Sequence, residues 1–172
     1  MKTFGIAGWK NSGKTGLMER LVTEIVRRGL SVSTIKHAHH AFDIDLPGKD
    51  SRRHREAGAR EVLVSSGKRW ALMHELREEK EPLLDALIAR MSPVDLVLIE
   101  GYKHALHPKL EVHRAETGKS LLCLTDPSIV AVASDVFLEG IDAKLMHLDD
   151  THAIADLVLA HCGLAAKAER EA

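Results

Sequence analysis

The chain has 172 residues and a net charge of −1, with 28% charged and only 3% aromatic residues. This length suits one domain with a sizeable core, whereas the balanced charge and the scarcity of aromatic rings argue against a nucleic-acid-binding protein. We expect a cytoplasmic protein that does not bind a membrane, because no secretory signal opens the chain and no run approaches the roughly 20 apolar residues of a membrane span.

The first third of the chain predicts a strand, a helix and a second strand. "TFGIAG" is a short apolar run, and residues 14–28 follow it with Leu17, Leu21 and Ile25 on one helical face. "LSVSTIK" then predicts the second strand. The polar, His-rich segment 37–50 that comes next is too long for a simple connector.

The middle of the chain predicts a short basic helix, a hairpin and another helix. "DSRRHREAGA" begins at a capping Asp50 or Ser51 and closes at Gly58. "EVLVSS" and "RWALMHEL" are strand-like runs joined by "SGK", which indicates a hairpin. We predict a helix over residues 80–91, with Pro82 in its first turn and an apolar face toward the core formed by Leu83, Leu84, Leu87 and Ile88.

The last part of the chain predicts the rest of a parallel sheet. "VDLVLIEG" is a continuous apolar run, typical of a strand buried on both faces. "KLEVHR", "LLCLTD", "IVAVASD" and "AKLMHL" are further strand candidates, "DDTHAIADLVLAHCG" predicts a last helix, and residues 163–172 form a tail that we expect to fray. We therefore predict one α/β domain over residues 1–172, with a mostly parallel sheet between helices and some antiparallel strands.

The stretch "GWKNSGKT" fits the Walker A pattern G-x-x-x-x-G-K-[ST] between a strand and a helix. Gly8 and Gly13 free the backbone to turn its N–H groups toward phosphate oxygens, Lys14 supplies a point charge, and the Thr15 hydroxyl suits Mg²⁺. The rest of the candidate loop consists of Lys10, Asn11 and Ser12. The pattern predicts a three-layer P-loop NTPase fold and a bound nucleotide, and the alternative is a chance glycine-rich turn.

A Walker loop normally works with an acid at the carboxyl end of a neighbouring buried strand. Glu100 ends "VDLVLIE" and is our candidate for holding Mg²⁺, directly or through water, or for orienting the attacking water in catalysis. Asp43 and Asp45 follow the second strand and are rival or additional Mg²⁺ ligands. The alternative for Glu100 is an acid that only caps its strand.

Three blocks in this order resemble one family: "GWKNSGKT", "IKHAHHAFDIDLPGKDSRRHREAGA" and "DLVLIEGYK". Over about residues 2–135 they are similar to the MobB family of molybdopterin-guanine dinucleotide biosynthesis proteins. The resemblance implies a dimeric GTP-binding accessory protein with Mg²⁺ and weak GTPase activity. It would assist a partner, the molybdenum cofactor guanylyltransferase, which itself attaches GMP to the molybdopterin cofactor.

The second block also carries many positive groups. Two groups of basic residues flank this segment and suit a second phosphorylated ligand, since arginine binds phosphate oxygens in pairs. They are Lys36, His37, His39 and His40 on one side, and Lys49, Arg52, Arg53, His54 and Arg55 on the other. A solvated basic helix is the plainer alternative. A metal site at His37, His39 and His40 is a third, but H-x-H-H matches no common zinc spacing.

Two further residues, Lys10 and Asp135, are candidate contacts for the nucleotide. Lys10 lies in the Walker loop, but the loop lysine that reaches a partner subunit's phosphate in dimeric relatives of the wider class follows the first glycine directly, whereas Trp9 intervenes here. Asp135 ends "AVASD" and is placed to accept the N1 and N2 hydrogens of guanine. No N-K-x-D motif is present, and a turn at the strand end is the alternative.

Two functions of other classes stay open at this point. A small-molecule or nucleoside kinase would use the same loop to transfer phosphate to an acceptor. A GTPase metal chaperone would bind Ni²⁺ or Zn²⁺ through the His-rich segment.

Overall fold

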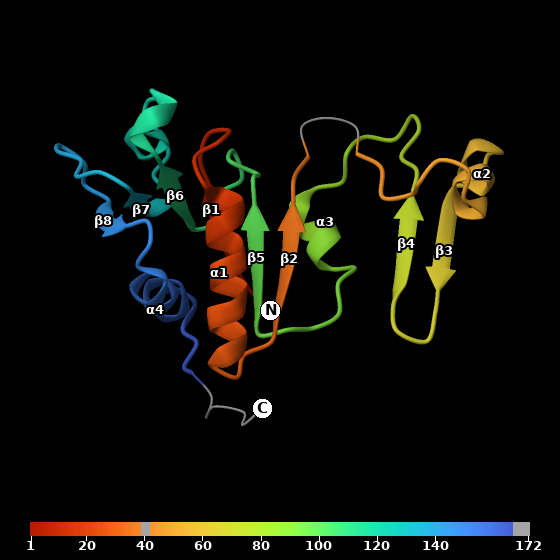
Figure 1. Ribbon diagram of the computed structural model, residues 1–172, viewed down its shortest axis with the longest axis horizontal. Coiled ribbons are helices and arrows are strands. Elements are labelled where there is room, and N and C mark those ends of the chain that lie inside the picture. The colour runs from red at the N-terminus through yellow and green to blue at the C-terminus, as the bar shows by residue number, and fades with distance from the viewer. Residues whose placement is uncertain (39–41, 167–172) are drawn as a thin grey trace. The chain divides into compact units, whose positions relative to one another are not determined.

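The computed structural model describes residues 1–38 and 42–166, which form two compact units (Figure 1). The first unit comprises Met1–His37 and the described residues from Met91 on, and the second comprises the described residues of Ala38–Arg90. The expectation of one domain over residues 1–172 stays a prediction. None of the helices in the described ranges is long and apolar enough to cross a membrane.

The first unit is built on a six-stranded sheet in which all neighbouring strands are parallel. Its order is β2-β5-β1-β6-β7-β8. The strands are β1 (Lys2–Ala7), β2 (Val32–Lys36), β5 (Leu96–Glu100), β6 (Lys109–His113), β7 (Ile129–Ser134) and β8 (Lys144–His147). Every residue of β5 is buried, as its continuous apolar run predicted. Because the strands are parallel, their carboxyl ends meet at one edge of the sheet.

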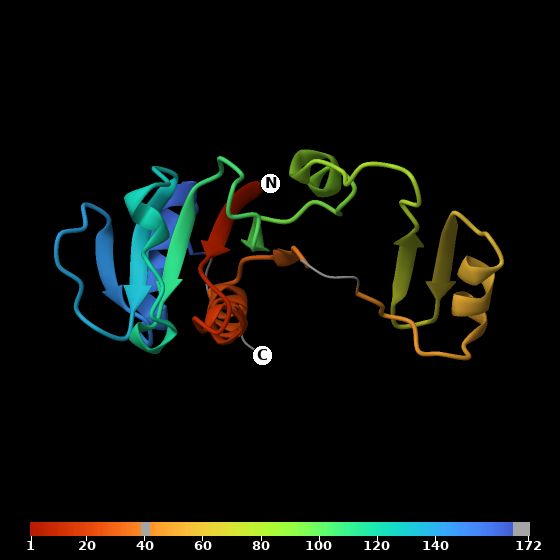
Figure 2. The ribbon, with the colours of Figure 1, turned by 90° about the horizontal axis from the view of Figure 1, so that it is seen from above.

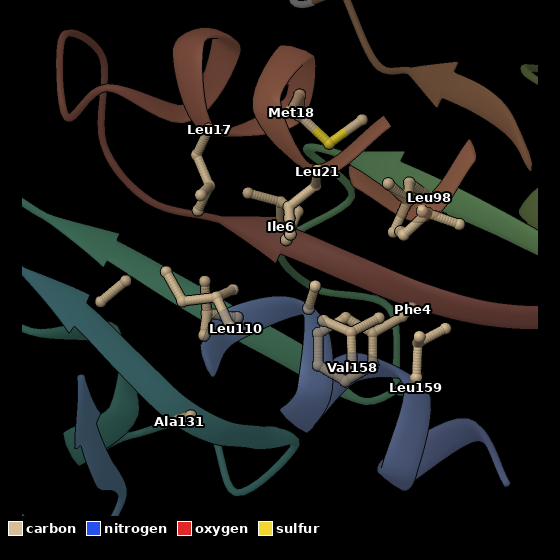
Figure 3. Packing of buried hydrophobic residues seen from close by; sticks show 14 of the residues in the cluster. Phe4, Ile6, Leu17, Met18, Leu21, Leu98, Leu110, Ala131, Val158 and Leu159 are labelled. Atoms are coloured by element: carbon tan, nitrogen blue, oxygen red, sulfur yellow. The ribbon is translucent and has the colours of Figure 1, made fainter. Parts of the chain in front are cut away.

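Two amphipathic helices, α1 (Lys14–Arg27) and α4 (Thr151–Cys162), cover one face of this sheet. Leu17 and Leu21 of α1 are fully buried against Phe4 and Ile6 of β1, and Val158 of α4 joins the same cluster (Figure 3). Each such side chain contributes roughly 1.5–3 kcal/mol by leaving water. The predicted helical face of residues 14–28 is therefore confirmed, and it fixes the helix that begins at the Walker lysine.

Two 3₁₀ helices, η1 (Ala115–Thr117) and η2 (Leu122–Leu124), lie between β6 and β7 along the chain. The expected strand "LLCLTD" is wrong, because its centre is η2. Both oxygens of the buried Glu111 accept backbone hydrogen bonds there, from Leu122 N at 2.8 Å and Cys123 N at 2.9 Å. This carboxylate takes the amide groups that a strand would give to a sheet ladder.

The second unit holds α2 (Asp50–Glu56), β3 (Glu61–Ser65), β4 (Trp70–His74) and α3 (Leu84–Ile88). The predicted hairpin is confirmed, because β3 and β4 pair antiparallel in a sheet of their own. Figure 2 shows α2 lying against β3, which buries Val62 beneath it. The helix-flanked parallel sheet and this separate antiparallel pair confirm the predicted α/β class.

The predicted helix over residues 80–91 is wrong in extent and in its buried face. Only Leu84–Ile88 is helical, no residue of that helix is buried, and Leu83 is 80% exposed. Leu83 has an extended backbone, with ψ at 150°, so it caps the helix and does not continue it. Most of the stability of a helix in a protein comes from packing of its apolar face, and no residue of this helix is buried. A longer helix is therefore not stabilised here.

Candidate functional site

The Walker loop, residues 8–13, joins β1 to α1 at the carboxyl edge of the first sheet. Gly8 has a φ of 141° and Gly13 a φ of 95°, both in a region that residues with a Cβ rarely adopt. A Cβ on Gly8 would also lie only 2.4 Å from the carbonyl oxygen of Val112 in β6. The two glycines of the motif are therefore required by the backbone itself.

Ser12 in this loop has a buried hydroxyl that fits a phosphate ligand. The residue is 1% exposed, and its Oγ has no hydrogen-bond partner among the described residues. Leaving such a group unsatisfied costs about 1–3 kcal/mol. Phosphate oxygens would accept its hydrogen bond, together with the N–H groups of the loop. The loop therefore fits the phosphates of a nucleotide.

Lys14 lies folded against its own loop, where its Nζ donates to the carbonyl oxygen of Trp9 at 2.6 Å. Burial lowers the pKa of Lys14 below its ordinary value, the carboxylate of Glu100 opposes that shift, and the charges of Lys36 and Lys103 add to it. Lys14, Lys36 and Lys103 thus lie at the same edge of the sheet as the carboxylate of Glu100. Such a local excess of positive charge suits a polyphosphate.

Glu100 ends β5 next to the Walker strand, as predicted. It stands beside Ile6 of β1 and Lys36 of β2 in the sheet register and is 9% exposed. Its Oε1 forms an ion pair with Lys36 Nζ at 3.2 Å. The structure therefore brings Glu100, Lys36 and the loop together. The roles of Glu100 and Thr15 in holding Mg²⁺ stay predictions, and Thr15 is exposed in the first turn of α1.

His37 packs against the turn that follows Glu100. Its N–H donates to the Glu100 carbonyl oxygen at 2.9 Å, and its ring centroid lies 4.5 Å from that of Tyr102. Its predicted partners His39 and His40 lie outside the described residues. Within residues 1–38 and 42–166, no three His, Cys, Asp or Glu side chains group as a metal site would need.

Lys10 and Asn11 are exposed on the outer arc of the loop. They border a cavity of about 460 Å³, whose other lining residues are Trp9, Glu116, Thr117 and Lys119. Trp9 Nε1 donates to the carbonyl oxygen of Ser120 at 2.8 Å, which ties the loop to the segment after β6. Contacts of Lys10 and Asn11 with a nucleotide stay predictions.

Asp135 follows β7, two strands away from β1. Its Oδ1 accepts a hydrogen bond from the backbone N–H of Ala115 at 3.0 Å. This bond matches the strand-end turn that the sequence left open, and it occupies one oxygen of the carboxylate. Guanine recognition by Asp135 stays a prediction.

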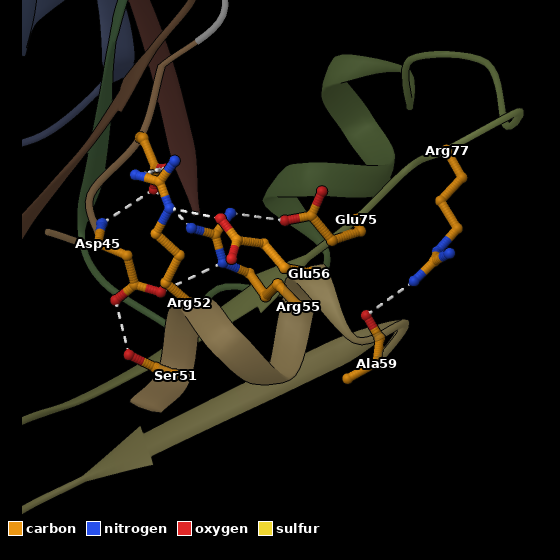
Figure 4. A network of polar contacts seen from close by, with 9 residues as sticks. Asp45, Ser51, Arg52, Arg55, Glu56, Ala59, Glu75 and Arg77 are labelled. Carbon is orange, nitrogen blue, oxygen red and sulfur yellow. Dashed lines mark hydrogen bonds and ion pairs between the residues drawn. The ribbon is translucent and has the colours of Figure 1, made fainter. Parts of the chain in front are cut away.

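The second unit contains an ion network around Arg55 (Figure 4). The guanidinium of Arg55 binds Asp43 at 2.7 Å, Glu75 at 2.7 Å and Asp45 at 3.2 Å. The side-chain hydrogen bond to Glu75 is the main cause that raises the pKa of Arg55. Asp45, a candidate Mg²⁺ ligand, also accepts from Ser51 Oγ at 2.9 Å. Its metal role stays a prediction.

Neighbouring acids neutralise part of the basic helix α2. Arg52 pairs with Glu56 at 2.9 Å and with Asp43 at 3.6 Å. Arg53 differs, because its side chain is 74% exposed and its contact with Asp50 is 3.6 Å long. His54 borders a cavity of about 590 Å³ in this unit. The cavity is also lined by Lys49 and Ser51, by the acids Asp45 and Asp50, and by side chains of β3 and of segment 44–46.

The sequence analysis missed Arg114. This residue directly follows β6, and a Cβ placed on Gly13 would lie 3.0 Å from its Nε. A basic residue immediately after a buried parallel strand is the signal that could have found it, since ligands bind at the carboxyl ends of such strands.

Comparisons with known proteins agree with this arrangement. The family profile described as "MobB: Molybdopterin guanine dinucleotide synthesis protein B" matches residues 3–135. The chain is 41% identical over 156 residues to the molybdopterin-guanine dinucleotide biosynthesis adapter protein of Escherichia coli strain K12, covering 89% of each chain. It is also 41% identical over 156 residues to the adapter protein of Haemophilus influenzae, covering 90% of this chain and 85% of that protein.

Solved structures show the same fold. The chain resembles a MobB homologue from Bacillus stearothermophilus with a TM-score of 0.70 and 30% identity, over 95% of this chain and 99% of that one. Against Bacillus subtilis MobB the TM-score is 0.76 with 26% identity, over 98% and 100% of the two chains. The three-layer P-loop NTPase fold predicted from the Walker loop is therefore confirmed. On the profile match and these relatives, the chain belongs to the MobB family.

Proposed function

We propose that this protein binds a guanine nucleotide at its Walker loop and acts as an adapter in forming the guanine dinucleotide of the molybdopterin cofactor. The observation that supports the nucleotide site is the buried Ser12 hydroxyl, which has no hydrogen-bond partner among the described residues, in a loop whose Trp9 carbonyl oxygen accepts a hydrogen bond from Lys14. The names of the relatives support the adapter role, and do not support a kinase or a metal chaperone. The nucleotide site belongs to the first unit.

Within this proposal, the residues of the Walker loop hold the phosphates and Thr15 and Glu100 hold Mg²⁺. When bound, Mg²⁺ supplies positive charge to the phosphate oxygens. Glu100 is placed at the neighbouring strand end where an acid can orient water, which is consistent with weak GTP hydrolysis.

The adapter would act in the cytoplasm as a homodimer beside the molybdenum cofactor guanylyltransferase. The bond between GMP and molybdopterin would form on that partner, so this chain would contribute binding and delivery. The name "adapter" of its relatives supports this division of labour.

We also propose that α2 offers a site for a second phosphorylated ligand, the molybdopterin cofactor. Arg53 and His54 are the residues that support it, because Arg53 is exposed and His54 borders the cavity of about 590 Å³. Arg52 and Arg55 are excluded from this role, since carboxylates of the same unit already bind them. A guanidinium without a strong partner is the better phosphate ligand.

Titration calorimetry with GTP and with ATP, both with Mg²⁺, tests the nucleotide proposal. We expect GTP to bind more tightly, and Asp135→Asn to narrow the difference, because a site built to hydrogen-bond one base edge rejects the other base. Lys14→Ala should weaken GTP binding about tenfold to hundredfold, the value of a hydrogen bond to a charged group. Lys68→Ala, an exposed lysine in the hairpin turn, is the matched control. Equal affinities for GTP and ATP would refute the guanine assignment.

A further inference from the structure

Arg114 reaches the Walker loop from a different strand. β6 lies beside β1 in the sheet, with Glu111 opposite Ala7, so the residues after Glu111 run alongside the loop. A Cβ on Gly13 would lie 3.0 Å from Arg114 Nε and 3.6 Å from its Nη2. The guanidinium therefore lies directly over Gly13, the residue before the Walker lysine.

Hydrogen bonds hold both the carbonyl oxygen and the N–H of the peptide group between Arg114 and Ala115, which restricts where the Arg114 side chain starts. Its carbonyl oxygen accepts hydrogen bonds from Thr117 N at 3.1 Å and from Thr117 Oγ1 at 2.8 Å. The next N–H, that of Ala115, donates to Asp135 Oδ1 at 3.0 Å. Asp135 thus positions the segment that carries Arg114.

The charge of Arg114 has no partner in the part of the chain that the structure describes. Its guanidinium forms no hydrogen bond or ion pair with those residues although it is partly buried, whereas Arg28 and Arg55 each hold a carboxylate at 2.7 Å. Withdrawing an arginine from water without an anion is unfavourable. A buried hydroxyl, Ser12 Oγ, also lacks a partner in the same loop.

We infer that Arg114 is a phosphate-binding residue of the nucleotide site. Its planar guanidinium suits the oxygens of a nucleoside diphosphate or triphosphate, which it would bind in addition to Lys14. This inference rests on the proposed nucleotide function and adds a residue outside the Walker motif. It also gives Asp135 a positioning role that does not depend on the base.

Two affinities, measured with the full chain, test this inference. One is for GTP, by calorimetry, and the other is for inorganic tripolyphosphate, by competition with a fluorescent GTP analogue. Arg114→Met removes the charge and keeps most of the aliphatic stem, and Arg114→Lys keeps the charge. We expect Arg114→Met to weaken GTP and tripolyphosphate by the same factor, about tenfold to hundredfold, and Arg114→Lys to recover part of the loss. Arg69→Ala, which removes an exposed arginine of the hairpin turn, should change neither affinity.

Two outcomes would overturn the inference. Unchanged GTP affinity in a folded Arg114→Met variant would show that the guanidinium does not touch the ligand. A loss for GTP without a loss for tripolyphosphate would assign Arg114 to the base or the ribose. The variant Lys14→Ala separates this result from the proposed function, because a GTP affinity that Lys14→Ala leaves unchanged would refute the nucleotide site itself.

Discussion

Glu24 is a buried acid on α1 that two arginines hold in its charged form. Its carboxylate accepts hydrogen bonds from Arg27 at 3.0 Å and from Arg28 at 2.7 Å, and His152 of α4 lies 3.0 Å from its Oε1. The hydrogen bond from Arg27 is the largest cause that lowers its pKa, to about 2. Arg28 continues the contact to Asp156, so these charges join the two helices of the core.

The low pKa of Glu24 predicts a specific loss of stability in acid. Because the folded pKa lies below the unfolded one, its contribution is complete above about pH 4.5 and is lost as the pH falls toward 2. Glu24→Gln should lower the free energy of unfolding at pH 7 by about 1–3 kcal/mol and flatten its decline between pH 5 and pH 3. Urea unfolding at pH 7, pH 5 and pH 3 measures both effects. The exposed Glu19→Gln is the control on the same helix, and an unaltered decline in Glu24→Gln would contradict the account.

At the same scale, the sequence located the site residues that belong to local motifs. Gly8, Gly13 and Lys14 follow from the spacing of one loop, and Glu100 from the acid that ends a buried strand. Arg114 could not be found in this way, because its place over Gly13 depends on the register between β6 and β1. The polar contact of Asp135 with Ala115 likewise depends on two strand ends that meet only in the fold.

Elements were predictable where one pattern extended over several turns or over a whole strand. The apolar run of β5 and the amphipathic α1 are such cases. "LLCLTD" has the composition of a strand, but a distant carboxylate, that of Glu111, captures its amides. Tertiary hydrogen bonding of this kind has no local signature, and it decided the conformation of that segment.

The basic helix α2 was predicted as an element, but its charge was read without its acidic partners. In the structure Asp43, Asp45 and Glu75 supply the counter-charge for Arg55, so its charge does not require an outside anion. The candidates for binding a phosphorylated ligand on α2 are therefore its exposed basic residues, Arg53 and His54.

A double variant, Arg53→Ala with His54→Ala, tests whether α2 serves a second ligand. We expect its GTP affinity to stay within about twofold of the wild type, because the Walker loop already supplies the phosphate ligands. Substitutions at exposed positions usually change a free energy by about 0.5 kcal/mol or less. Formation of the dinucleotide cofactor should fall steeply in cells whose own copy is deleted. Arg69→Ala controls for the loss of a charge. Full cofactor formation would reject the second site, and a large loss of GTP affinity would assign these residues to the nucleotide.

At the scale of the whole molecule, three separated sequence blocks predicted the family, and the profile match over residues 3–135 covers nearly the same span. This worked because the blocks combine a common phosphate loop with a far more specific middle segment. The division into two units was not apparent, since no linker or change of composition marks residues 38 and 90. The residues through which an adapter contacts its partners do not have to form a recognisable sequence motif.

The central claim is that nucleotide binding at the Walker loop is needed for the adapter role. It is tested most directly by the activity of a molybdoenzyme that requires the guanine dinucleotide cofactor, in cells whose own copy of this protein is deleted. The wild-type chain and the Lys68→Ala control should restore that activity. Lys14→Ala, present at the same level and folded, should restore little of it, because the lysine proposed to bind the phosphates is gone. Full restoration by Lys14→Ala would contradict the account.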